Sequence, residues 1–541
     1  MKSLRIPLLS LSLLMAAPSA FGQWDCNNPI SGPDVIVGSL NGICNWGTVS
    51  GRSSYSFGAT ACNVGDVEMI WQGNTNHHPI ISPNIFRLKD GRFEQIALGW
   101  MKHGFGSATE NLCCNCQDPG TSQIIGVGCA DTYANCQNGW QNAITSGGNL
   151  VSGIGPRSDI NPVTGAFAWP YTLFNDTGND IYKRPQPLIA DLEPSQNAGA
   201  RYYAEVHYIT PDEGAIAKHY NNASHREMVV DNFLGGPQMW DLDFIGGTLI
   251  GEPGLFAWQN ADATVLLDNV EDAEGGRFWV GSNAYDNLDG TWDYEYALYN
   301  MNSRIGANSI SIPTGGSISN VGFHDVETPD TSYSTVDWPG IIGAGTVDWA
   351  TGSGANANAI RWGTVFNFRF TSDQPPTTGQ VTIGEYLAGG TLNADAKVPD
   401  GNACGTSVFC STAPNSFGAG ELISASGSTS VTANNMSLTT IAGVPGEFGL
   451  FYYGTTAINT LFGDGFRCVG GLTTRLNPPQ TSDVFGDTTR PLDFNSAPMN
   501  AGSGMITPGS TWYFQHWYRD PGGSGGSGFN LSAGISAVFC P

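Results

Sequence analysis

The chain has 541 residues and a formal net charge of -25, with 22 Lys and Arg against 47 Asp and Glu. Nucleic-acid binding requires basic patches that neutralise phosphates, so this charge argues against DNA or RNA as a partner. Charged residues make up only 13% of the chain, whereas glycine alone numbers 72. This composition suits short strands joined by polar turns, and we predict an all-β protein.

Residues 1–22 have the pattern of a secretory signal peptide. Lys2 and Arg5 precede an apolar run at 6–17, and Ala20-Phe21-Gly22 places small residues where a signal peptidase requires them. We expect cleavage before Gln23 and a protein that is secreted or held at the cell surface. No later apolar stretch reaches the roughly 18 to 20 residues of a spanning helix, so no transmembrane segment is expected.

Composition divides the remaining chain into modules. Residues 23–235 contain eight of the twelve cysteines and are predicted to form a cysteine-rich β domain. Residues 236–387 contain no cysteine and are predicted to form a β-sandwich. A segment rich in Gly, Ala and Asp at 388–401 is expected to link it to a C-terminal β-sandwich module at 402–541. We therefore expect multi-domain β-sandwich or jelly-roll architecture, stapled by disulfides at both ends.

Period-two patterns locate individual strands. Residues 201–210 alternate two sets of side chains, as a strand in a sheet requires. Residues 360–370 put Phe366 and its apolar neighbours on one face and polar residues on the other, which predicts an antiparallel strand with one buried side. Residues 292–299 and 511–518 carry aromatics on both faces, which indicates strands covered on both sides.

The cysteines predict disulfides, because their number is even in each block and export favours oxidation. At the C-terminal end we expect Cys404 to pair with Cys410 and Cys468 with Cys540. The connectivity of the eight N-terminal cysteines stays open. The Cys-Cys-Asn-Cys run at 113–116 could instead belong to a thiolate metal cluster, but zinc sites usually show paired Cys-x2-Cys knuckles. The sequence therefore favours disulfides.

Histidines supply the candidates for a metal site. His78 lies in a polar turn, His103 follows a strand, and His207 shares a strand face with Glu205. Neutral imidazoles bind copper or zinc, and a nearby carboxylate can orient a ligating ring. No His-x-His or His-Glu-x-x-His spacing supports this assignment. The sequence favours the plainer interpretation, in which these histidines are hydrogen-bonded and partly buried.

Carboxylates give weaker signals. Asp286-Asn287-Leu288-Asp289-Gly290 resembles a calcium-holding turn, but it lacks the closing Glu of an EF-hand loop, so an ordinary turn is favoured. Asp241 and Asp243 could be opposed by Glu205, or by Asp191 and Glu193, as a glycosidase pair. Such catalysis depends on a controlled separation of the two carboxyl groups, which follows from the fold. We therefore assign no catalytic residue, and whether the protein is an enzyme stays open.

The C-terminal part carries a fairly specific pattern. It comprises Phe-Gln-x-Trp-Tyr-Arg-Asp-Pro at 514–521, a glycine run, Phe-Asn-Leu-Ser at 529–532 and the cysteine-containing segment 465–471. Residues 402–541 look like a C-terminal β module of large secreted bacterial proteins that are uncharacterised. The resemblance implies export and modularity, and it implies no activity and no catalytic residue.

Two functions from different classes follow. The first is an exported, surface-associated binding or structural protein whose partners are carbohydrate or cell-surface components, because Trp and Tyr on short strands stack on sugars. The second is an extracellular copper oxidoreductase that uses His78, His103 and His207, with Glu205 nearby. The sequence favours the first.

Overall fold

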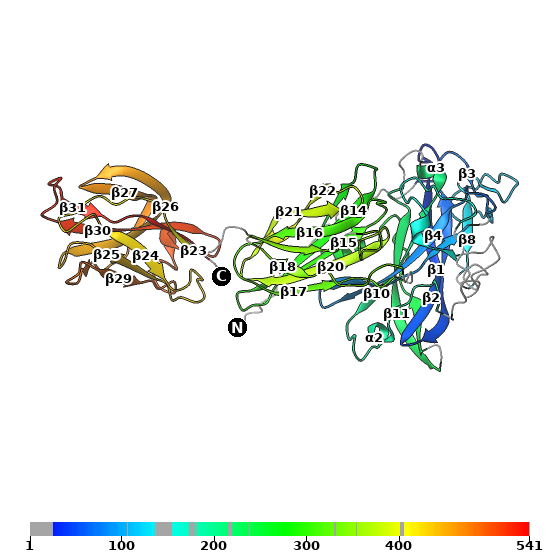
Figure 1. Ribbon diagram of the computed structural model, residues 1–541, viewed down its shortest axis with the longest axis horizontal. Helices are drawn as coiled ribbons and strands as arrows, with labels where there is room; N and C mark the ends of the chain where they lie inside the picture. Colours follow the sequence, from blue (N-terminus) through cyan, green and yellow to red (C-terminus); the bar gives the residue numbers. More distant parts are fainter. Residues whose placement is uncertain are drawn as a thin grey trace, which may run out of the picture.

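The computed structural model describes residues 25–539 except 105, 135, 137–153, 172–178, 180, 215–218, 237–238, 329–331, 344, 353 and 401–404. The regular secondary structure of the described chain is nearly all strand, which confirms the predicted all-β class. Figure 1 shows an elongated molecule, with the N-terminal sheets at one end and the C-terminal module at the other. None of the described helices is long and apolar enough to span a membrane. The predicted signal peptide lies outside the described residues.

Two sheets form the N-terminal sandwich. One has the order β1-β2-β8, and the other has the order β12-β11-β10-β4-β6-β9, with β5 paired to β4. The strands are β1 (Val35–Val49), β2 (Arg52–Asn63), β8 (Ala130–Tyr133), β12 (Met239–Phe244), β11 (Ala223–Gly235), β10 (Arg201–Ile209), β4 (Ile80–Lys89), β6 (Met101–His103), β9 (Ile154–Gly155) and β5 (Arg92–Leu98). The core between the sheets includes Tyr202, Ala204, Val206 and Tyr208, all from one face of β10.

Four disulfides among the described residues tie this sandwich together. They are Cys26–Cys114, Cys44–Cys136, Cys62–Cys113 and Cys116–Cys129. Adjacent Cys113 and Cys114 take different partners, so the run at 113–116 is bound to the N-terminal segment, to β2 and to Cys129 rather than to a metal. The predicted disulfides are confirmed for this end of the chain.

The cysteine-free part is a second sandwich. Its sheets have the orders β13-β14-β15-β20-β17 and β18-β19-β16-β21-β22. The strands are β13 (Leu266–Glu271), β14 (Arg277–Asp286), β15 (Trp292–Asn300), β20 (Thr364–Ser372), β17 (Ile318–His324), β18 (Gly340–Ile342), β19 (Thr346–Ala350), β16 (Ala307–Pro313), β21 (Pro376–Glu385) and β22 (Thr391–Pro399). Aromatic side chains of β15 and β20, among them Tyr296 and Phe368, fill the core between the sheets.

Strand β22 corrects the linker predicted at 388–401. Residues 391–399 pair with β21 along their whole length. Ala394, Ala396 and Val398 are buried in the sandwich core, each at no more than 4% exposure. Their small side chains resemble a linker in composition, although their period of two is that of a strand.

The two sandwiches share a packed seam, so the four large sheets described before residue 400 are stacked on one another. The face of β10 opposite the first core carries Tyr203, which packs with Phe86, Phe93, Tyr299 and Val365 in one buried cluster. Strands β10 and β15 are therefore covered on both faces, as predicted for 292–299. The boundary expected at residue 235 falls within the first sheet, because β12 follows it and pairs with β11.

Strand β20 is also covered on both faces, contrary to the single buried side predicted for 360–370. Asn367 is only 4% exposed, and its amide donates to the carbonyl of Phe93 at 2.7 Å. The polar face that the sequence suggested would meet water instead meets the N-terminal sandwich. A polar residue at such a position is tolerated because its hydrogen bond is made.

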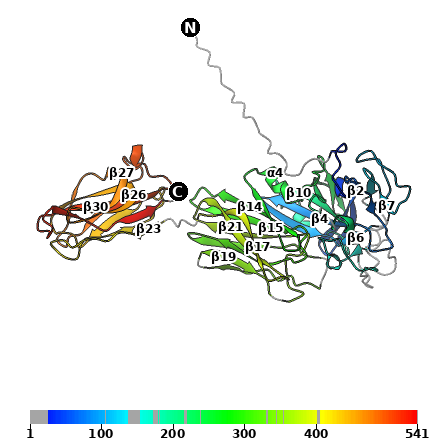
Figure 2. The same ribbon diagram turned by 90° about the horizontal axis from the view of Figure 1, so that it is seen from above.

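The C-terminal module is a separate sandwich. One sheet has the order β23-β32-β30-β26-β27, with β28 and β31 attached, and the other has the order β24-β25-β29. The strands are β23 (Gly405–Val408), β32 (Ile535–Val538), β30 (Thr511–Asp520), β26 (Phe448–Phe462), β27 (Gly465–Arg475), β28 (Gln480–Thr481), β31 (Gly528–Leu531), β24 (Leu422–Ser426), β25 (Ser437–Ile441) and β29 (Thr488–Pro491). Figures 1 and 2 both show this module apart from the others.

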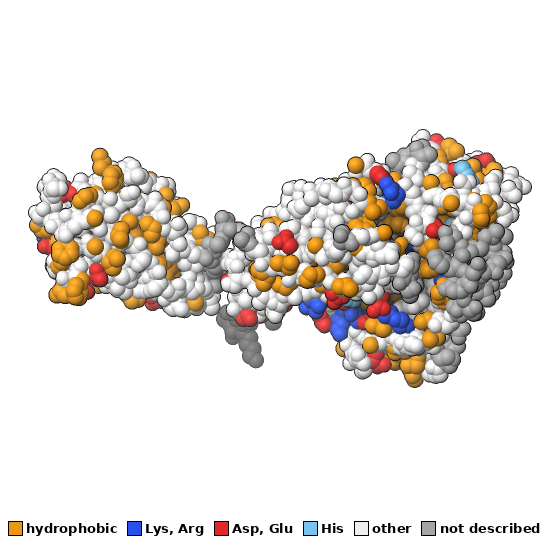
Figure 3. All heavy atoms as spheres, in the orientation of Figure 1, with side chains coloured by type: hydrophobic (Ala, Val, Ile, Leu, Met, Phe, Trp, Pro, Cys, Tyr) orange, Lys and Arg blue, Asp and Glu red, His pale blue; other side chains and the backbone are white. Residues whose placement is uncertain are grey.

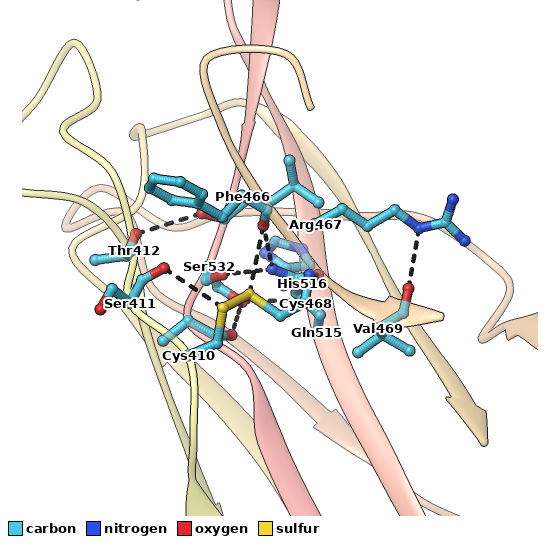
Figure 4. The surroundings of a disulfide bond; sticks show 12 residues. Cys410, Ser411, Thr412, Phe466, Arg467, Cys468, Val469, Gln515, His516 and Ser532 are labelled. Atoms are coloured by element: carbon cyan, nitrogen blue, oxygen red, sulfur yellow. Dashed lines mark hydrogen bonds between the residues drawn. A yellow bond between two sulfur atoms is a disulfide. The ribbon is translucent and has the colours of Figure 1, made fainter. Parts of the chain in front are cut away.

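The described disulfide of this module corrects the predicted pairing. Cys410 is bonded to Cys468, so Cys410 does not pair with Cys404 and Cys468 does not pair with Cys540. Figure 4 shows the bridge beside Gln515, whose amide donates to the carbonyls of Phe466 and Ser532. Pairing follows proximity in the fold, where β27 lies beside the segment after β23. Cys404 and Cys540 lie outside the described residues.

Removing this bridge is expected to destabilise the C-terminal module. The bonded cysteines are 58 residues apart, and a loop of that length corresponds to about 4 kcal/mol of unfolded-state entropy. We expect the double variant Cys410→Ser, Cys468→Ser to lower the free energy of unfolding of residues 405–539 by this amount. Chemical denaturation with hydrogen exchange measures it, and Ser411→Ala is the control. If the double variant has the same denaturation midpoint and slope as the parent chain, this expectation is contradicted.

Candidate functional site

The structure brings two of the predicted metal residues together. Nδ1 of His78 lies 3.2 Å from the carbonyl oxygen of Gln72, and Nε2 of His78 lies 2.9 Å from Nδ1 of His103. Since a carbonyl only accepts, His78 carries its proton on Nδ1 and its Nε2 accepts from the Nδ1–H of His103. Nε2 of His103 then holds a lone pair, and no described residue donates to it.

Aromatic rings enclose this histidine pair. The ring of His103 stacks on Tyr171 with centroids 3.7 Å apart, and Phe167 lies within 5.2 Å of both imidazoles. Burial lowers the pKa of His78 to about 4 and lowers the pKa of His103 well below its usual value. Both imidazoles are therefore neutral at pH 7.

The other two predicted ligands do not complete a metal site. Both oxygens of the Glu205 carboxylate are engaged: Asn84, Tyr299 and the backbone N–H of Gly254 donate to them at 2.6–2.7 Å. Burial raises the pKa of Glu205, and these donors oppose the rise. His207 packs against Trp362, and burial lowers its pKa to about 3.

Across the part of the chain that the structure describes, no three His, Cys, Asp or Glu side chains are arranged to hold a metal ion. The copper or zinc centre expected from His78, His103, His207 and Glu205 is thus not assembled there. The turn at 286–290, which was considered for calcium, uses its carboxylates in local hydrogen bonds. Asp286 accepts from the N–H of Leu288, and Asp289 accepts from the N–H and hydroxyl of Thr291.

A cavity of about 610 Å³ opens at the seam between the first two sandwiches. Six aromatic residues contribute to its wall: Trp100, Phe167, Tyr333, Trp362, Phe366 and Tyr386. Trp362 and Phe167 also contact the histidines described above, which therefore lie behind the cavity wall. Figure 3 shows charged side chains gathered beside this junction on a surface that is otherwise largely uncharged.

Arginine side chains hold the aromatic wall in place. The guanidinium of Arg361 lies over the ring of Tyr333, with its Cζ atom 3.8 Å from the ring centroid. The same Cζ atom lies 5.3 Å from the ring centroid of Tyr386. Its guanidinium donates to three backbone carbonyls in the segment 355–359. The hydroxyl of Tyr386 donates to the carbonyl of Gly354. The rings at the mouth are thus oriented before any ligand arrives.

Arg157 holds the aromatic wall in the same way, deeper in the seam. It is 9% exposed, and it donates to the carbonyls of Gly99, Pro83 and Gly363 and to the side chain of Asn84. Trp362 donates in turn to the carbonyl of Arg157 at 2.8 Å. Burial lowers the pKa of Arg157 to about 10, so the guanidinium remains protonated at pH 7.

Sequence reasoning missed this site for a physical reason. Its lining comes from two stretches, 98–168 and 304–387, which were predicted to belong to separate domains. Only the seam brings them together. The aromatic residues of 360–370 were recognised as strand residues, but Trp362 lies just before β20 and faces the cavity rather than the sandwich core.

The sequence matches no protein-family model and no curated protein. Among solved structures, the chain is similar to a tetra-tandem repeat in the extending region of a large adhesion protein, at 8% identity and a TM-score of 0.15, over 90% of this chain and 96% of that one. A BSP domain of a biofilm-associated protein aligns at 7% identity and a TM-score of 0.12, over 93% of this chain and 67% of that one. Likeness at this level supports no functional argument.

The buried histidines predict a pH-dependent stability. His78 has a pKa of about 4 in the folded chain against 6.5 ordinarily, so the unfolded chain binds the proton first as the pH falls. The contribution of His78 to the free energy of unfolding is therefore complete above pH 6.5. It is lost as the pH falls toward 4, and the free energy of unfolding then decreases by about 3 kcal/mol. Urea denaturation at pH 7.5 and 4.5 measures this loss. His78→Gln should show a smaller loss, and an identical loss would contradict the assignment.

Proposed function

We propose that the chain is an exported, surface-associated binding protein that takes a carbohydrate into the seam cavity. The observation that carries this proposal is the ring-lined cavity itself, with Tyr333 and Tyr386 at its mouth and Trp362 deeper inside. Aromatic faces stack on sugar rings, and adjacent polar groups bond to their hydroxyls. A volume of about 610 Å³ is typical of sites for small organic ligands.

Export is supported by the covalent framework. Five disulfides join described cysteines, four in the first sandwich and one in the last. Such bonds form and persist in oxidising compartments outside the cytosol. The predicted signal peptide at 1–22 agrees with this location.

Binding is favoured over hydrolysis of the carbohydrate. Glycoside hydrolysis usually needs two carboxyl groups on either side of the scissile bond. Among the described residues that line the cavity, Asp159 is the one carboxylate. Glu205, considered from the sequence as a member of such a pair, is fully buried and committed to its three donors.

Truncating a ring at the mouth tests this function. Tyr386→Ala should weaken glycan binding by about 5- to 30-fold, because a buried aromatic contact commonly contributes about 1–2 kcal/mol. A glycan array screened with the full chain would identify the ligand, and calorimetric titration would then compare the variants.

Phe485→Ala is the matched control, because Phe485 is 71% exposed in the distant C-terminal module. It should leave the glycan affinity unchanged. Absence of any glycan on the array, or equal affinities for the Tyr386 variant and the parent chain, would refute the proposed function.

A further inference from the structure

A small cavity of about 130 Å³ lies against strands β10 and β11. Arg201 and Tyr203 line it from β10, and His225 and Glu227 line it from β11. The segment 245–249 and helix α4 (Phe256–Ala261) complete its wall. The residues that line it differ from those of the seam cavity, so the two are separate sites.

The pairing of β10 with β11 brings Tyr203 and His225 together. Tyr203 lies opposite Glu227, and His225 lies opposite Glu205. Since side chains two residues apart share a face, Tyr203 and His225 are diagonal neighbours on one face of the sheet. Their ring centroids are 5.9 Å apart, and the ring planes are nearly perpendicular, at 79°.

Both side chains carry a buried polar atom to which no described residue bonds. His225 is 1% exposed, and its Nδ1 donates to the carbonyl of Glu252 at 2.8 Å, so Nε2 holds a lone pair. Neither this Nε2 nor the hydroxyl of Tyr203, which is 3% exposed, has a partner among the described residues. Buried polar groups in native proteins nearly always have partners. The cavity therefore offers one acceptor and one hydroxyl donor to a bound group.

The rest of the wall indicates a neutral ligand group that carries carbon. Arg201 and Glu227 pair with each other through two hydrogen bonds of 2.8 and 2.7 Å, so they leave no net charge. Ala257 and Leu249 add apolar surface. The volume equals that of about four water molecules, so a single hydroxyl group would fill only a small part of it.

We propose that this cavity binds the acetamido group of an N-acetylated sugar, as a second site beyond the seam cavity. The N–H of the acetamido group donates to Nε2 of His225, and its carbonyl accepts from the hydroxyl of Tyr203. Its methyl group contacts Leu249 and Ala257. The sugar ring stays outside, where exposed Asn260 lies at the rim. A primary amide fits less well, because its second N–H finds no acceptor.

Saturation-transfer NMR during titration with N-acetylglucosamine tests the proposal. The full chain carries Tyr386→Ala, so that the seam cavity contributes little to the signal. We expect N-acetylglucosamine to bind with the strongest transfer at its methyl group. Glucose and glucosamine, which lack the acetamido group, should bind about tenfold more weakly or not at all, because they leave the buried polar atoms unsatisfied.

Two added substitutions separate recognition from folding. Tyr203→Phe removes only a hydroxyl that has no described partner, so the melting temperature should be unchanged while binding weakens by about fivefold or more. Leu249→Ser, at a side chain that is 41% exposed, should also weaken binding, whereas Phe485→Ala should not.

The proposal is overturned if N-acetylglucosamine does not bind, if glucose binds as tightly, or if Tyr203→Phe binds like its parent. The glycan array and the Tyr386→Ala comparison test the seam cavity independently, so either site can fail without the other.

Discussion

A fully buried hydrogen bond at the seam is the contact on which the first 400 residues depend. The hydroxyl of Tyr299 on β15 donates to Glu205 on β10 at 2.7 Å, and Asn84 connects the same carboxylate to Arg157. A carboxylate and a guanidinium withdrawn from water are stable only when their hydrogen bonds are satisfied. Here they are satisfied only if the two sandwiches pack in one arrangement, because the donors and acceptors come from both.

The seam also explains where a ligand site can form. Packing two sandwiches face to face leaves irregular space at the rim, where strands give way to loops, and ligand sites are frequent at such junctions. Arg157 and Arg361 donate hydrogen bonds to backbone carbonyls around this space. Arg157 holds Trp362 in position, and Arg361 holds Tyr333 and Tyr386. The arginines thus stabilise the wall, and the rings are left to contact the ligand.

Local sequence patterns predicted the strands well. They did not predict contacts between residues far apart in the sequence. The alternation in 201–210 and the aromatics of 292–299 matched the observed strands, because side chains in a strand alternate by geometry. Residues 388–401 were misassigned, because Ala394 and Ala396 are small enough to resemble a linker. The pairing of Cys410 and the seam cavity depend on neighbours far apart in sequence. His78 and His103 suggested a metal site, but their burial among rings made them a neutral hydrogen-bonded pair.

Calorimetric unfolding of the full chain tests the central claim most directly, with hydrogen exchange to assign each transition. If the seam makes the first two sandwiches one cooperative unit, residues 25–400 unfold in a single transition and residues 405–539 in another. Tyr299→Phe should then lower the first transition as a whole and leave the second unchanged. Separate transitions for the cysteine-rich and cysteine-free sandwiches would contradict the account.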